Sequence, residues 1–186
     1  MKKPSELFKN MGVRYAAIAV LPLLALLWVP ITNFVTLYAG ENVLLEVIPV
    51  DPTDFLRGDY VILNYKVSDI PDGLVPRDLA DNWHGYGEKR DVYVTLEKDS
   101  DGIGHVKGVS ANRPGGLHLK GSLDRYFTVQ YERINAYYVP EGTGYEIENK
   151  IRESGVLADL RVLRGSAVIK GLVFKEDDGG ETRRND

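Results

Sequence analysis

Charged residues are absent from one long stretch near the start of the chain. Residues 15–40 read YAAIAVLPLLALLWVPITNFVTLYAG, a run of 26 positions without a charge. A helix needs about 20 apolar residues to cross the hydrocarbon core of a bilayer. The run is long enough, and nothing after it is apolar enough to cross again. The pattern therefore predicts one transmembrane anchor that contacts the lipid bilayer over 15–40, followed by one water-soluble domain.

The flanks of the anchor predict its direction, because short flanks rich in Lys and Arg stay in the cytoplasm. The basic residues before it are Lys2, Lys3, Lys9 and Arg14. We therefore expect a cytoplasmic tail over 1–14 and a domain on the outer side of the membrane, which is the periplasm if the cell has two membranes and is otherwise extracellular. The alternative is a cleaved signal, which has an apolar core of about 7–15 residues before a small-x-small site. Leu37 stands where that site would need a small residue before Ala39.

After Gly40 the apolar pattern changes to a period of two, which is typical of half-buried strands. In residues 59–67, for example, Val61, Leu63 and Tyr65 share one face and alternate with more polar neighbours. Runs of this kind are 42–50, 59–67, 91–98, 103–110, 117–121, 126–133, 136–139, 156–164 and 166–174. An Asp/Gly turn at 99–102 joins two of these runs and predicts a hairpin.

One helix is predicted within the domain. Thr143 and Glu146 match a capping box, and Ile147 and Ile151 supply an apolar stripe, so the helix spans 143–154. The fold class is therefore mainly β, in the α+β sense, with an antiparallel β-rich domain over 41–175. A short helical piece is expected near 76–82, and a polar tail over 176–186 is expected to be disordered.

Composition excludes several classes of function. The chain has no Cys, which excludes disulfides, thiolate metal sites and a Cys nucleophile. Four basic residues and one acidic residue lie in 1–40, so the total charge of −4 leaves −7 for the remainder. An acidic domain without a basic cluster is not expected to bind nucleic acid. No metal-ligand spacing or cofactor motif stands out, so no cofactor is predicted.

Residues 57–65, RGDYVILNY, fit the pattern Gly-Asp-Tyr-x-x-Leu-x-Tyr at every fixed position. The string resembles the GDYXXLXY family of bacterial membrane-anchored proteins. A second block at 138–144, YVPEGTG, is similar to that family as well. The resemblance implies an N-terminal anchor and a multi-spanning membrane protein as a possible partner, and it supplies no activity. The candidate binding residues of the two blocks are Arg57, Gly58, Asp59, Tyr60, Leu63, Tyr65, Pro140, Glu141, Gly142 and Gly144.

Three functions remain open from the residues. The first is an interaction module that serves a membrane protein or an envelope complex, which we favour because tyrosines are enriched at interfaces. The second is an envelope hydrolase with carboxylates such as Asp59 and Glu141 placed across one pocket. The third is a small-ligand sensor with a cavity among the strands. No catalytic residue is assigned, and the motif itself also has a plain structural interpretation as a turn and a packed strand.

Overall fold

The computed structural model describes residues 11–48, 60–71, 73–81, 88–140, 147, 151 and 155–174. The chain forms two compact units, Met1–Val35 and Thr36–Asp186. The predicted tail over 176–186 lies outside the described residues.

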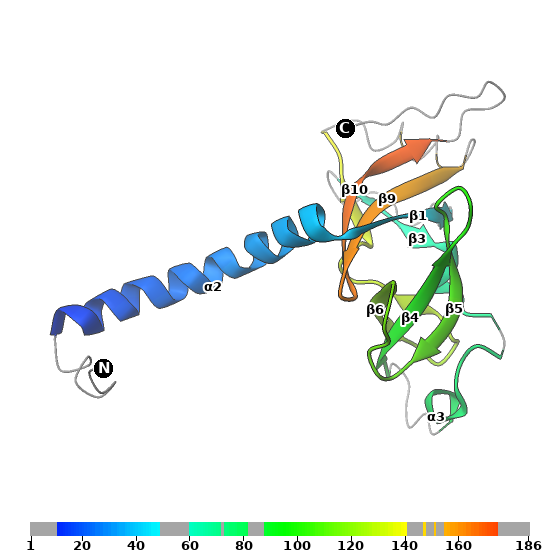
Figure 1. The fold of residues 1–186 in the computed structure, drawn as a ribbon, viewed down its shortest axis with the longest axis horizontal. Helices are drawn as coiled ribbons and strands as arrows, with labels where there is room; N and C mark the ends of the chain where they lie inside the picture. Colours follow the sequence, from blue (N-terminus) through cyan, green and yellow to red (C-terminus); the bar gives the residue numbers. More distant parts are fainter. Residues whose placement is uncertain are drawn as a thin grey trace. The chain divides into compact units, whose positions relative to one another are not determined.

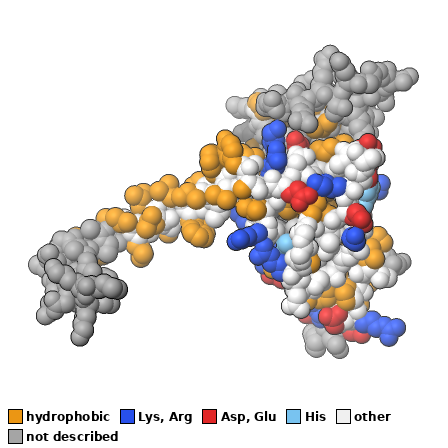
Figure 2. Space-filling view, in the orientation of Figure 1, with side chains coloured by type: hydrophobic (Ala, Val, Ile, Leu, Met, Phe, Trp, Pro, Cys, Tyr) orange, Lys and Arg blue, Asp and Glu red, His pale blue; other side chains and the backbone are white. Residues whose placement is uncertain are grey.

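The described part of the first unit belongs to a long apolar helix, α2, which spans Met11–Ala39. Its segment Ile18–Ala39, of 22 residues, is long and apolar enough to cross a membrane. Apolar side chains such as Leu21 and Trp28 are exposed along it, and Figure 2 shows hydrophobic side chains over its surface. Exposed apolar surface of this extent is unfavourable in water. The helix matches the predicted span and is compatible with a single-pass membrane anchor.

The β-rich domain contains two four-stranded antiparallel sheets. The first has the order β10-β9-β1-β3, with strands β1 Glu41–Ile48, β3 Asn64–Tyr65, β9 Val156–Leu163 and β10 Ser166–Phe174. The second has the order β5-β4-β6-β7, with strands β4 Arg90–Lys98, β5 Gly104–Ser110, β6 His118–Leu123 and β7 Val129–Gln130. Figure 1 shows both groups of strands. The predicted mainly antiparallel β fold is therefore confirmed.

Single bridges join the two sheets. Leu44 of β1 donates its backbone N–H to Gly102 at 3.0 Å, and Lys120 of β6 donates to Gly165, in the turn between β9 and β10, at 2.9 Å. A third, smaller sheet pairs β2 Tyr60–Ile62 with β8 Ala136–Tyr138. The short helix α3, Arg77–Ala80, lies where a helical piece was predicted.

Two predicted strands are shorter in the structure than in the sequence pattern. The run over 59–67 is interrupted at Leu63, and a 3₁₀ helix, η2, follows β3 over Lys66–Ser68. The alternation of the run is still confirmed, because Val61, Leu63, Tyr65 and Val67 are all buried. Each such apolar side chain contributes about 1.5–3 kcal/mol by its burial.

The run over 126–133 is reduced to the two residues of β7 because a turn occupies its start. The Asp124 carboxylate accepts hydrogen bonds from the backbone N–H groups of Tyr126 and Thr128, at 2.9 and 3.0 Å. Phe127 has a φ of 59°, in the left-handed region that interrupts a strand. The side chain of Asp124 therefore competes successfully with sheet pairing at this point.

The predicted helix over 143–154 lies almost entirely outside the described residues. Only Ile147 and Ile151 of it are described, and both have helical conformation. Ile151 is buried in the core, and Ile147 packs against that core.

The predicted hairpin at 99–102 is confirmed, since β4 and β5 pair in antiparallel register. Asp99 organises the turn. Its carboxylate accepts hydrogen bonds from the backbone N–H groups of Asp101 and Ile103, each at 2.9 Å, and contacts His105 Nε2 at 2.8 Å. The hydrogen bond from His105 is the largest cause that lowers the pKa of the Asp99 carboxyl, followed by the bond from Ile103.

Asp99 is expected to titrate in the folded protein below the ordinary Asp pKa of about 3.9. A depressed folded pKa stabilises the turn above the unfolded pKa, and this contribution is lost as the pH falls through the folded value. A His105→Ala variant should raise the pKa of Asp99 only part of the way, because the backbone donors remain. Carboxyl NMR titration of the two proteins tests this, and an identical Asp99 pKa in both would contradict it.

Candidate functional site

The candidate binding residues from the sequence divide into two sets. Arg57, Gly58, Asp59, Glu141, Gly142 and Gly144 lie outside the described residues. Tyr60, Leu63, Tyr65 and Pro140 are described. A pocket that joins Asp59 to Glu141, as the hydrolase hypothesis requires, therefore involves two residues outside the described part of the chain.

The structure brings the two motif blocks together in the β2–β8 ribbon. Tyr60 of the first block pairs with Tyr138 of the second in the register of the strands. Their ring centroids are 5.9 Å apart with an interplanar angle of 55°. Tyr138 is 78% exposed, and Pro140 is exposed two residues further on. The ribbon therefore presents a cross-strand tyrosine pair at the protein surface. Its two members are 78 residues apart in the sequence.

Tyr65 lies on the opposite face of the motif strand from Tyr60 and has a different environment. Its side chain is 1% exposed, and its hydroxyl donates a hydrogen bond of 2.6 Å to the carbonyl of Ile134. Burial raises the pKa of the Tyr65 phenol well above its usual value, so the hydroxyl remains a proton donor. Tyr65 therefore has a structural role, because its hydroxyl joins the motif strand to the segment that contains Ile134.

Tyr131 makes a matching contact in the opposite direction, and it is not among the candidate binding residues from the sequence. Its hydroxyl donates to the carbonyl of Val67 at 3.0 Å, and burial raises the pKa of its phenol as well. The Tyr65 and Tyr131 rings meet nearly edge to face, with centroids 6.4 Å apart. The apolar alternation of Val129 and Tyr131 signalled a buried ring, but no local signal connects it to Tyr65.

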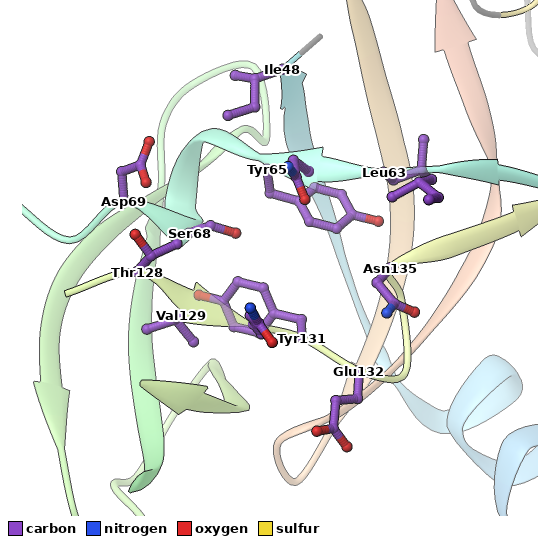
Figure 3. Close-up of a pocket in the computed structure, with 13 residues that line it drawn as sticks. Ile48, Leu63, Tyr65, Ser68, Asp69, Thr128, Val129, Tyr131, Glu132 and Asn135 are labelled. Carbon is purple, nitrogen blue, oxygen red and sulfur yellow. The ribbon is translucent and has the colours of Figure 1, made fainter. Parts of the chain in front are cut away.

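A pocket of about 310 Å³ lies at this crossing, and we call it the tyrosine pocket. Its lining includes Leu63 and Tyr65 from the motif strand and Tyr131 from the opposite segment. Figure 3 shows the two tyrosine rings between the segments, with Asp69 and Glu132 at opposite ends. The pocket thus combines an apolar floor with a polar rim.

A second hollow, of about 280 Å³, is lined by charged residues that include Asp91 and Lys120. The Lys120 ammonium lies 2.7 Å from the Asp91 carboxylate. The hydrogen bond that Lys120 donates to the Asp91 carboxylate is the largest cause that raises the pKa of Lys120. A lysine in this state remains a cation, so it is unsuited to act as a nucleophile or a general base.

Metal binding finds no support in the described ranges, where no group of three or more His, Asp or Glu side chains could hold an ion. His105 contacts the Asp99 carboxylate, as described above, and His118 contacts the Gly116 carbonyl oxygen through Nδ1 at 2.7 Å. These two histidines lie on β5 and β6, which flank β4 on opposite sides.

Comparison with known proteins identifies one family. The family model described as GDYXXLXY protein matches residues 22–172, which is most of the chain. The matched range includes the motif strand, the β2–β8 ribbon and both four-stranded sheets except the last two residues of β10. No curated protein matches. No solved structure matches either.

Proposed function

The chain belongs to the GDYXXLXY family, and from this premise we propose that it is a membrane-anchored interaction module for a multi-spanning membrane protein. The observation that carries the proposal is the tyrosine pair of the β2–β8 ribbon, in which Tyr138 is exposed and Tyr60 is partly buried. Tyrosine combines a large apolar ring with a hydroxyl at low entropic cost, which suits it to binding surfaces. The two motif blocks therefore converge on a surface with the chemistry of an interface.

The position of the domain in the cell is part of the proposal. The basic residues before the anchor, Lys2, Lys3, Lys9 and Arg14, favour a cytoplasmic N-terminus. The β-rich domain would then lie on the outer side of a bacterial inner membrane, in the periplasm or extracellular. Only Gly40 separates α2 from β1, so a spanning helix would hold the start of the domain at the membrane surface.

The attachment of the domain to the membrane is the reason why we propose a partner in the same membrane. Confinement to one surface raises the effective concentration of any partner in the same bilayer, so a small contact area is sufficient. Tyr60, Tyr138 and the partly buried Ile62 would form such a small contact. A soluble partner would need a larger interface to reach the same occupancy.

The absence of Cys from the chain makes a direct test possible, since one introduced thiol is unique. In intact cells, a full-length Tyr138→Cys variant should react with a membrane-impermeant maleimide added outside, after permeabilisation of any outer membrane. The same variant, labelled with a benzophenone maleimide and irradiated, should cross-link to an integral membrane protein. Mass spectrometry of the adduct identifies the partner.

Tyr126→Cys is the matched control, because Tyr126 is 73% exposed but lies outside the β2–β8 ribbon. It should react equally well with the impermeant maleimide and yield little or no adduct after irradiation. Equal adducts at both positions, or none at either, would refute the ribbon as the docking surface. Labelling only after the cytoplasmic membrane is permeabilised would refute the orientation.

A further inference from the structure

We propose that the tyrosine pocket binds a neutral, polyhydroxylated ligand of the saccharide class. The proposal goes beyond the docking function and uses other polar groups. Tyr60 and Tyr138 do not line the pocket, and Ile62 is the one docking residue that does. The proposal rests on two observations: the gap between segments 63–70 and 127–135, and the polar side chains at the mouth of the pocket.

The pocket is held open by hydrogen bonds at both of its ends. At one end the backbone N–H of Leu63 donates to Asn135 at 2.9 Å. At the other end the N–H of Ile70 donates to Phe127 at 3.2 Å. These bonds show that segments 63–70 and 127–135 run antiparallel, as an interrupted strand pair.

Between these ends the two segments are joined by side chains. The η2 turn moves Lys66–Ser68 out of strand geometry, and the tyrosine hydroxyl bonds described above cross the gap in opposite directions. A ligand would therefore enter a preformed site, and little binding energy would be lost in ordering the protein.

The polar side chains of the rim are suited to hydrogen bonding with the hydroxyl groups of a sugar. Four of its side chains can both donate and accept hydrogen bonds, as each sugar hydroxyl can. These residues are Asn64, Ser68, Thr128 and Asn135. A fifth polar side chain, Gln130, also lines the pocket, but its Oε1 already accepts from Lys89 at 2.7 Å. An apolar ligand would leave the rim groups desolvated and unpaired, which is costly.

The charges of the rim exclude anionic ligands. Among the described residues that line the pocket, Asp69 and Glu132 are the acidic ones, and none is Lys, Arg or His. A phosphate or carboxylate would be repelled. Because the two carboxylates lie at opposite ends of the pocket (Figure 3), a compact cation could neutralise only one of them. Hydroxyl groups can donate to both, and they also match the four neutral side chains. The volume of about 310 Å³ is at the lower end for ligand sites and suits a sugar ring or the end of a short oligosaccharide.

The test uses the full-length protein in lipid nanodiscs, because detergents with sugar head groups would compete. The probes are N-acetylglucosamine, chitobiose and maltose, with spermidine and inorganic phosphate as charged comparators. Titration followed by saturation-transfer NMR should show saturable binding of at least one of the sugars with a Kd of about 1 mM or tighter. Phosphate and spermidine should give no saturable effect.

Two substitutions place the binding in the pocket. Asn135→Ala and Thr128→Val each remove a hydrogen-bonding group and should weaken sugar binding about 5- to 10-fold. Asn112→Ala is the matched control, since Asn112 is exposed and lies outside the pocket, and it should leave the affinity unchanged. Melting curves of all three variants would establish that they are folded.

Two results would overturn the proposal: no saturable binding of any of the sugars, or binding that is unaffected by both pocket substitutions. Saturable binding of spermidine in the first case would assign the pocket to cationic amines. None of these outcomes bears on cross-linking at Tyr138, so a failure here is distinguishable from a failure of the docking proposal.

Discussion

Replacement of Tyr65 by phenylalanine should lower the free energy of unfolding by about 1–3 kcal/mol, because it leaves the buried carbonyl of Ile134 without its hydrogen-bond donor. The aromatic ring and its packing remain, so the decrease in the free energy of unfolding measures the contribution of the hydroxyl group alone. Urea unfolding of the full-length protein in nonionic micelles, followed by tyrosine fluorescence, measures the effect.

Tyr60→Phe is the matched control, since it makes the same chemical change in the same motif. Tyr60 is only partly buried, and its hydroxyl makes no hydrogen bond within the described residues. Its substitution should therefore change the free energy of unfolding by less than about 0.5 kcal/mol. Equal losses for both variants would show that the hydroxyl of Tyr65 has no special structural role. A Tyr131→Phe variant completes a double-mutant cycle, in which nonadditive losses would reveal coupling between the two hydroxyl bonds.

Substitution of Gly121 by alanine should destabilise the domain by about 3 kcal/mol, through overpacking at the junction of β6 and β7. A Cβ at Gly121 would lie 2.9 Å from the carbonyl oxygen of Gln130 and 3.0 Å from the Tyr131 ring, and it would also collide with Val129. A backbone oxygen cannot move aside as a flexible side chain can. The strain would therefore reach Tyr131 and its bond to Val67.

Gly108→Ala offers the comparison on β5 of the same sheet. A Cβ at Gly108 would meet no atom within 4 Å, and alanine restricts the unfolded chain more than glycine does. Its stability should therefore stay within about 0.5 kcal/mol of the parent protein or rise slightly. Thermal melts of both variants in micelles provide the measurement. A Gly121→Ala protein that melts with the parent would show that β6 and β7 can separate at little cost.

The strand predictions succeeded where a local rule was sufficient. The hairpin of β4 and β5 followed from two alternating runs around an Asp/Gly turn, and the structure has the same elements to within about two residues. They were less accurate where a single side chain changed the backbone. The carboxylate of Asp124 converts the start of the predicted run over 126–133 into a turn, and the alternation of that run gives no warning of this.

The candidate site was only partly predictable for a related reason. The motif string identified Tyr60 and Tyr65, and the period of two assigned them to opposite faces of one strand. Pairing of Tyr60 with Tyr138 and of Tyr65 with the carbonyl of Ile134 joins positions 78 and 69 residues apart. Partners at such separations are selected by the fold as a whole, since many tyrosines in the sequence have the same local pattern.

The apolar helix, the β character of the domain and the buried face of the run over 59–67 could be predicted from the amino-acid sequence alone. These properties follow from composition and from spacing within one element, where the side-chain period is imposed by backbone geometry. The pairing of the strands, the meeting of the two motif blocks in one ribbon and the pocket between Tyr65 and Tyr131 became known only from the folded chain. Contacts of this kind depend on the simultaneous packing of distant segments, which no short stretch of sequence encodes.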